Sequence, residues 1–161
     1  MSPLSQLRDH IDDILDVMED GIFVSDHTGM AIHVNKAYEQ ISGLSVEDLR
    51  GSTVQELQRR GTFNKILNPE IVRTKQSASV VQEVGKGKKT IHLRGFPILD
   101  DEGEVRFVVT FARDVTAIAQ LREQIAEQRR VIEQYQGSMA KILSARYEGG
   151  IIAGAAMQKL L

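Results

Sequence analysis

The stretch that decides the fold is GIFVSDHTGMAIHVN, residues 21–35. It contains two short runs rich in β-branched and aromatic residues, separated by DHTG at 26–29. Aspartate at the first position of this tetrapeptide and glycine at the fourth suit a type I turn, because glycine is free to adopt a positive φ. The segment LDDEGEV, residues 99–105, repeats the arrangement with Asp100 and Gly103. Both patterns predict β-hairpins.

Several short helices with explicit start signals are predicted after the first hairpin. Four polar residues are placed to cap them: Asn35, Ser45, Thr53 and Asn68. The first of these helices covers 36–42 and ends at Gly43, and the last begins at Asn68-Pro69 and ends at about Gln76. None of them is long enough to be stable alone, so each depends on its cap and on packing.

Three strands are predicted over about 78–84, 89–98 and 104–113, where Val, Ile, Thr and Phe are abundant. The segment GKGK at 85–88 reads as a hairpin turn, and Pro97 should lie near a strand end or at an unpaired position. Short turns favour an antiparallel sheet, and segregated helices favour the α+β class. One face of the sheet should be covered by the short helices, enclosing a core or a small cavity.

The first 20 residues predict a single amphipathic helix that begins at Ser2-Pro3 and ends near Gly21. Its apolar residues share one face: Leu4, Leu7, Ile11, Ile14, Leu15 and Met18. The acidic residues of RDHIDDILDVMED, 8–20, fall elsewhere, and we interpret them as a solvated face and not as a metal site.

A heptad pattern follows the last strand, over 117–146. Its core positions, spaced alternately by three and four residues, are Ile118, Leu121, Ile125, Gln128, Ile132, Tyr135, Met139 and Ile142. The natural way to bury such a stripe is a parallel coiled-coil dimer; the alternative is packing back on the domain. Gln128 at a core position weakens the pattern, and Gly137 is a point where the helix is expected to kink or end.

Composition excludes several classes of protein. The 161 residues carry a net charge of −2, which does not suggest a nucleic-acid-binding surface, and they include no cysteine. Disulfides, thiolate metal sites and cysteine nucleophiles are therefore excluded. The N-terminus lacks the apolar core of a signal peptide, and the apolar C-terminal stretch is too short to span a bilayer. These features lead us to expect a cytoplasmic protein with no membrane segment.

Residues 19–57 and 96–116 resemble the two halves of a PAS domain. The matching features of the first half are Gly21-Ile22, Asp26 with Gly29, Val34-Asn35, Ala37, Ile41, Gly43, Leu49 and Gly51. Those of the second half are the proline after the fourth strand, the Asp-Asp-Glu-Gly turn, the apolar fifth strand and the exit Asp114-Val115-Thr116. The resemblance implies a PAS fold over 21–116, with a five-stranded antiparallel sheet and a sensing or dimerising role.

The exit Asp114-Val115-Thr116 also has a direct physical interpretation. An aspartate and a threonine where a strand turns into a helix can cap the first-turn N–H groups, and the negative charge suits that end of the helix dipole. In PAS proteins the matching motif couples the sheet to a signalling helix. An ordinary N-cap is the simpler alternative, and both roles are compatible.

The resemblance also limits which ligands are candidates. Flavin photochemistry that needs a cysteine is excluded, whereas non-covalent flavin is not. The helix that carries the proximal histidine in haem-binding PAS domains corresponds to 69–76, which has no histidine. The scatter of the four histidines argues against a metal site. For a small organic ligand the candidate polar groups are Asn64, Arg73, His92 and Arg94. The alternative is that these side chains are solvated and that a filled domain only dimerises.

No catalytic constellation is visible, and the sequence lacks the G-x-x-x-x-G-K-[ST] phosphate loop. A kinase phosphoacceptor histidine would have to follow the exit helix, and no histidine occurs after His92, so the histidine-kinase interpretation fails for this chain. We therefore expect no enzymatic activity. A regulatory input module for a separate effector and a structural dimerisation domain both remain open.

The segment ARYEGGIIAGAAMQKLL, residues 145–161, resembles the opening of the AAA+ ATPase domain of bacterial sigma-54-dependent activators. Ile151-Ile152, Gly154 and Met157-Gln158-Lys159 match; the serine is missing and the spacing is one residue short. The resemblance implies a PAS input, an AAA+ motor and a helix-turn-helix module that work with sigma-54 RNA polymerase. We expect residues 147–161 to begin the motor, and 149–161 to be disordered or covered by a neighbouring molecule.

Overall fold

The computed structural model describes residues 1–84 and 89–160, and for 150–160 it describes the backbone alone. Residues Met1–Thr116 form one compact unit, and the residues from Ala117 onward form another. Each unit is described separately below. The predicted GKGK turn at 85–88 lies outside the described residues.

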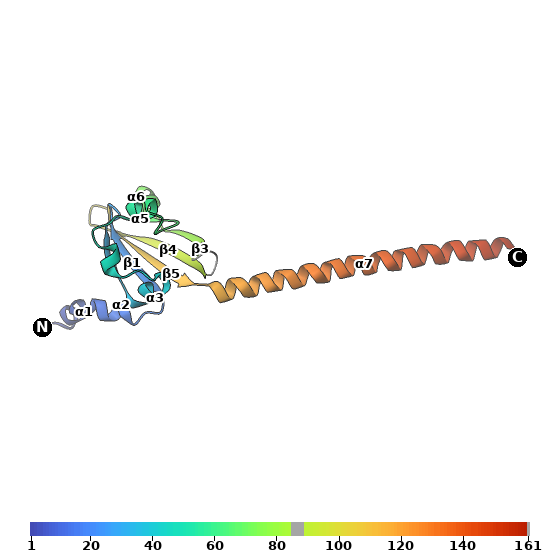
Figure 1. Cartoon of the computed structure of the whole chain (residues 1–161), viewed down its shortest axis with the longest axis horizontal. Coiled ribbons are helices and arrows are strands. Elements are labelled where there is room, and N and C mark those ends of the chain that lie inside the picture. The colour runs from blue at the N-terminus through green and yellow to red at the C-terminus, as the bar shows by residue number, and fades with distance from the viewer. Residues whose placement is uncertain (85–88, 161) are drawn as a thin grey trace. The chain divides into compact units, whose positions relative to one another are not determined.

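The first unit is built on a five-stranded antiparallel sheet (Figure 1). The strands are β1 (Gly21–Asp26), β2 (Ala31–Val34), β3 (Ala78–Val84), β4 (Lys89–Leu99) and β5 (Val105–Asp114). Their order across the sheet is β2-β1-β5-β4-β3, so the first and last strands in sequence pair at its centre. The predicted α+β class and five-stranded PAS architecture are confirmed.

The two predicted hairpin turns form as expected. Gly29 and Gly103 have φ values of +90° and +81°, a region that favours glycine. In each turn the aspartate side chain accepts backbone N–H groups: Asp26 from Thr28 and Met30, and Asp100 from Glu102 and Glu104. The strands therefore begin and end where the aspartate–glycine pairs place them.

Four short helices lie between β2 and β3: α3 (Lys36–Ser42), α4 (Val46–Leu49), α5 (Val54–Arg59) and α6 (Asn68–Thr74). Asn35 caps α3, and Ser45 and Thr53 form reciprocal capping boxes at α4 and α5, as predicted. The prediction for Asn68 was wrong: Leu67 is the N-cap of α6. The Asn68 carboxamide donates instead to Ser25 and to the backbone of Asp26, because the helix lies against the inner face of the sheet.

The helices cover the sheet face that carries the core. One cluster gathers around Phe23, Tyr38, Leu49, Val54, Leu57, Ile91 and Ala112, and a second around Leu67, Ile71, Val105 and Val108. Gly95 in β4 permits the close approach of α6, since a Cβ at this position would lie 2.4 Å from Ile71 Cδ1. Pro97 lies near the end of β4, beyond the Ala78↔Gly95 pair where β3 pairing ends, as expected.

The N-terminal segment forms two helices, α1 (Pro3–Asp9) and α2 (Ile11–Asp16), which corrects the prediction of one continuous helix. The break lies at His10, which has a φ of −109° and ψ of 20°. More than half of the Leu4 and Leu7 surfaces is exposed, so packing contributes little to α1 and a helix this short is marginal alone. The backbone of α2, in contrast, is anchored to the sheet, as described below.

The second unit is α7, a helix that begins at Thr116 and runs to Leu160. It continues through Gly137, where a kink or an end was predicted, because an exposed glycine costs a helix only about 1 kcal/mol. The backbone is also helical from 149 to 160, where disorder or cover by a neighbouring molecule was expected. The seven apolar seam residues between Ile118 and Ile142 are each 40–66% exposed. Within the described part of the chain, no helix is long and apolar enough to cross a bilayer.

Candidate ligand cavity and exit junction

A cavity of about 470 Å³ lies between the inner face of the sheet and the segments around α3 and residues 61–68. Its walls are mainly apolar, with Phe23, Tyr38, Ile41, Leu44, Phe63, Ile66, Ile91 and Leu93 among the lining residues. Several of these side chains, including Phe63 and Leu93, remain partly exposed although they pack on the core. The volume falls within the range typical of small-molecule sites, roughly 300–1,000 Å³.

Apart from Tyr38 and Gln82, the polar lining residues fall into two groups. The first group is exposed and marks the mouth: Ser42, Thr62, Asn64, Lys65 and Lys89. The second group lies deeper, on β1, β5 and the start of α6: Ser25, Thr110 and Asn68. Ser25 is 1% exposed and Asn68 is 4% exposed, so both are buried polar groups at the inner end.

The side chains of Ser25 and Asn68 form a hydrogen bond with each other. Asn68 Nδ2 donates to Ser25 Oγ at 2.8 Å and to the carbonyl oxygen of Asp26 at 2.9 Å. Since a carbonyl oxygen can only accept, the second bond fixes which end of the carboxamide faces β1. Neither residue was predicted from the sequence to line the cavity. The sequence does contain a signal for Ser25. Alternate residues of a strand point to the same face of the sheet, so Ser25 lies on the same face as the apolar Phe23 in β1.

Of the four predicted ligand-binding residues, one lines this cavity. Asn64 lies at the mouth, where its Nδ2 donates to the backbone of Glu83 at 3.1 Å. Arg73 is on α6 and is not among the lining residues. His92 and Arg94 alternate along β4 with Ile91 and Leu93, which line the cavity, and therefore lie on the opposite face of the sheet.

On that opposite face, His92 and Arg94 border a second hollow of about 370 Å³, together with Asp20, Phe96, Phe111 and Arg113. Phe96 and Phe111 meet edge to face at 5.9 Å, and the Arg94 guanidinium lies 5.4 Å from the Phe96 ring centre. Arg113 donates two hydrogen bonds of 2.8 Å to the Asp20 carboxylate. These bonds lower the pKa of Asp20, against a smaller opposing effect of burial.

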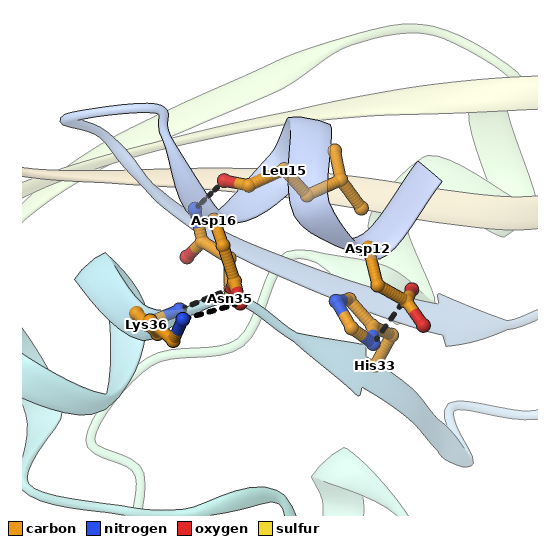
Figure 2. A network of polar contacts seen from close by, with 6 residues as sticks. All are labelled: Asp12, Leu15, Asp16, His33, Asn35 and Lys36. Atoms are coloured by element: carbon orange, nitrogen blue, oxygen red, sulfur yellow. Dashed lines mark hydrogen bonds and ion pairs between the residues drawn. The ribbon is translucent and has the colours of Figure 1, made fainter. Parts of the chain in front are cut away.

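Asn35 joins α2, β1 and α3 at the edge of the core (Figure 2). Its side-chain oxygen accepts the N–H groups of Ile22 and Tyr38, and its nitrogen donates to the carbonyl groups of Leu15 and Asp20. The residue is fully buried, and the two bonds that it accepts are shielded from water at both ends.

An Asp16–Lys36 ion pair and a His33–Asp12 contact on the α2 side complete this network. The Asp16 carboxylate accepts the Lys36 N–H at 3.0 Å and pairs with the Lys36 ammonium at 3.2 Å, and His33 Nδ1 lies 3.7 Å from Asp12 (Figure 2). The hydrogen bond from the Lys36 backbone, followed by its side chain, lowers the pKa of Asp16. Together these contacts fix α2 beside the sheet.

The exit junction links the end of β5 to the start of β4. The Thr116 hydroxyl donates to Asp114 and accepts the Thr90 backbone N–H at 2.9 Å. The Val115 N–H donates to the Thr90 carbonyl, also at 2.9 Å. The Thr116 side chain and then its backbone donate to Asp114 and lower the pKa of that carboxyl. The predicted relay residues therefore form one bonded group at the start of α7.

The histidines do not converge on the cavity. All four lie in the described part of the chain, at the α1–α2 break, in the β1–β2 turn, and on β2 and β4, and none lines the cavity. Over residues 1–84 and 89–160, no group of three potential metal-ligating side chains comes together.

A family model described as PAS fold matches residues 15–120, which is well over half of the chain. The chain belongs to the PAS family. The matched range begins at the last two residues of α2 and includes the whole sheet, the cavity and the exit junction, so these features lie within the PAS domain itself.

Solved structures share this PAS fold at low sequence identity. The PAS domain of BvgS from Bordetella pertussis is 18% identical with a TM-score of 0.55, over 78% of this chain and 98% of that one. An RNA-binding light-oxygen-voltage receptor is 17% identical with a TM-score of 0.63, over 84% of this chain and 40% of that one. The phage VqmA–DPO complex is 14% identical with a TM-score of 0.53, over 77% and 59%. A search of curated proteins gave no match.

Proposed function

We propose that this PAS domain is a sensory input module that binds a small organic ligand and relays its presence through α7. The observation that carries the proposal is that the cavity wall and the exit junction meet at consecutive residues of β4. Ile91 lines the cavity, and the preceding residue, Thr90, forms hydrogen bonds with both Val115 and Thr116. A ligand that shifts β4 thus acts on the start of α7 through bonds one residue away.

In this proposal α7 dimerises through its heptad seam. The seam residues are exposed in the single chain, and the helix is uninterrupted over all their positions. A parallel coiled coil would bury this stripe, and it would place two copies of the exit junction at the same end. A change at Thr116 would then alter both helices together.

The proposed receiver of the signal is the AAA+ motor of a sigma-54-dependent activator, in the cytoplasm. The resemblance of 145–161 to the opening of that motor supports this assignment, and the helical backbone through Leu160 supplies a continuous connection to it. The module itself binds and transmits, and catalysis belongs to the motor.

A ligand-free dimerisation domain is the second candidate function. The observation that favours it is the exposed apolar surface of α1 and α2, where Leu4, Leu7 and Ile11 are 49–58% exposed. A second copy that covered this surface would account for the amphipathic pattern without any ligand.

Two experiments test the proposal. The natural coding sequence beyond Leu161 should encode a G-x-x-x-x-G-K-[ST] loop, and its absence would sink the AAA+ assignment. The chain can also be fused through α7 to the AAA+ domain of a sigma-54-dependent activator, in a series of helical registers. We expect ATPase activity in at least one register to depend on the module and to respond to Thr116→Val. Equal activity with and without the module in every register would contradict the relay.

A further inference from the structure

The inner end of the cavity has hydrogen-bonding capacity that the protein does not use. Both protons of Asn68 Nδ2 are used in hydrogen bonds, one to Ser25 Oγ and one to the Asp26 carbonyl. The Ser25 oxygen therefore acts as an acceptor, and its own proton has no acceptor among the described residues. Buried polar groups in proteins are usually hydrogen-bonded, and this unused capacity is available to a ligand.

Asn68 Oδ1 is the complementary group. The described residues provide it with no hydrogen-bond donor. The fully buried side-chain atoms that lack a hydrogen-bond partner are His33 Nε2 and Gln55 Oε1, and Asn68 Oδ1 is not among them. The oxygen thus retains accessible surface. Because Asn68 is 4% exposed and lines the cavity, we infer that this surface faces the cavity.

The inner end accordingly offers a donor from Ser25 beside an acceptor from Asn68. Thr110, which lies on the same face of β5, adds a hydroxyl with no partner among the described residues. The charged residues that line the cavity, Lys65 and Lys89, are both exposed at the mouth. A charged ligand group at the inner end would lose its hydration without gaining an opposite charge.

We propose that the inner end of the cavity binds an uncharged ring lactam or primary carboxamide, held by Ser25 and Asn68. The ligand carbonyl accepts the Ser25 hydroxyl proton, and the adjacent ligand N–H donates to Asn68 Oδ1. The apolar remainder of the ligand lies against Phe23, Ile91 and Leu93. This inference rests on the proposed sensory function and adds the chemical class that the cavity selects.

Matched pairs of probes test the inference on the full chain by ligand-observed NMR titration. Carbostyril carries the lactam, N-methylcarbostyril lacks its N–H, and quinaldate is a charged analogue of similar size. Benzamide, N,N-dimethylbenzamide and benzoate form the corresponding open-chain set. We expect each N–H probe to bind about tenfold or more tightly than its methylated partner, because the latter leaves Asn68 Oδ1 unpaired. The carboxylates should be weaker still.

Three variants locate the contacts. Ser25→Ala should weaken carbostyril about tenfold, since the carbonyl then loses its donor. Ser79→Ala, at an exposed position of β3 outside the cavity lining, is the matched control and should leave the affinity for carbostyril unchanged. Leu93→Trp fills the cavity and should abolish binding of every probe. The comparison between probes needs only the wild-type chain, so it holds even if a variant fails to fold.

The outcomes separate this inference from the function on which it rests. Equal binding of methylated and unmethylated probes, all blocked by Leu93→Trp, would overturn the lactam class and leave the cavity as a ligand site. A failure of all the N–H probes to bind at millimolar concentration would also overturn the inference, whereas the relay would still be tested by the ATPase fusion. Probe binding that survives Leu93→Trp would contradict both.

Discussion

The hydroxyl of Thr116 accepts the backbone N–H of Thr90 at 2.9 Å, across 26 residues of sequence. The same hydroxyl donates to Asp114, so one side chain connects the start of β4, the end of β5 and the first turn of α7. Because Thr90 directly precedes the cavity residue Ile91, this bond links the candidate ligand site to the helix that would carry its signal.

Thr116→Val should break this link while keeping the shape of the side chain. The half-buried Thr90 N–H would lose its acceptor, at a cost of about 1 kcal/mol in the free energy of unfolding measured with urea. Hydrogen exchange of the Thr90 amide should accelerate. Thr116→Ser retains the hydroxyl and is the control that should restore slow exchange. Equal exchange in the valine and serine variants would show that the hydroxyl does not hold β4.

Substitutions of Asn35 should destabilise the fold in graded steps. Asn35→Asp keeps the two accepted hydrogen bonds and loses the two donated to Leu15 and Asp20, whereas Asn35→Ala loses all four. We expect Asn35→Ala to lower the free energy of unfolding by about 3 kcal/mol or more, with aspartate between alanine and wild type. Asn64→Ala, which removes one exposed bond, should change it by less than about 0.5 kcal/mol. A similar loss for Asn64→Ala and Asn35→Ala would refute the role of burial.

The contrast between Asn35 and Asn68 shows what the sequence can predict here. In the sequence, both stand where a short helix begins, and both look like N-caps. The cap at Asn35 depends on a local backbone pattern, which the sequence contains. The role of Asn68 depends on α6 lying against Ser25, 43 residues earlier in the chain, and only the tertiary arrangement determines that contact.

The strands show the same division. The sequence located all five strands and both aspartate–glycine turns, since these features are local. In the sequence His92 and Arg94 also alternate with Ile91 and Leu93, but the prediction of cavity residues did not take this alternation into account. The two basic residues therefore lie beside Phe96, across the sheet from the cavity. Which face of β4 meets the helices follows from the pairing of β4 with β3 and β5.

The Asp20–Arg113 pair should make stability depend on pH in the acid range. The hydrogen bonds from Arg113 lower the pKa of Asp20 in the folded state. The stabilisation that the ionised Asp20 carboxylate gives the folded state is therefore fully present above the unfolded-state pKa of about 3.9. It is lost as the pH falls through the lower folded-state pKa. The difference in melting temperature between the wild type and Asp20→Asn should shrink below about pH 4. A difference that stays constant down to complete acid unfolding would argue against this pairing.

Charges placed in the heptad seam should weaken dimerisation. Ile125→Asp with Ile132→Asp introduces two carboxylates per chain into an apolar interface, and sedimentation equilibrium should show a shift toward monomer. The control, Ala126→Asp with Gln134→Asp, adds the same charges on the opposite side of α7 and should leave the dimer intact. If the control dissociates as readily as the seam variant, the seam does not form the interface.

The absence of cysteine allows single spin labels at chosen positions of α7, and these test the central claim most directly. Glu123→Cys and Ser144→Cys lie on the side opposite the seam, 21 residues and about 31 Å apart along the helix. In a parallel dimer, double electron–electron resonance should give the same short distance between the two copies at both positions. No dipolar signal at either position, or a distance that is short at one and long at the other, would contradict the parallel dimer on which the proposed relay depends.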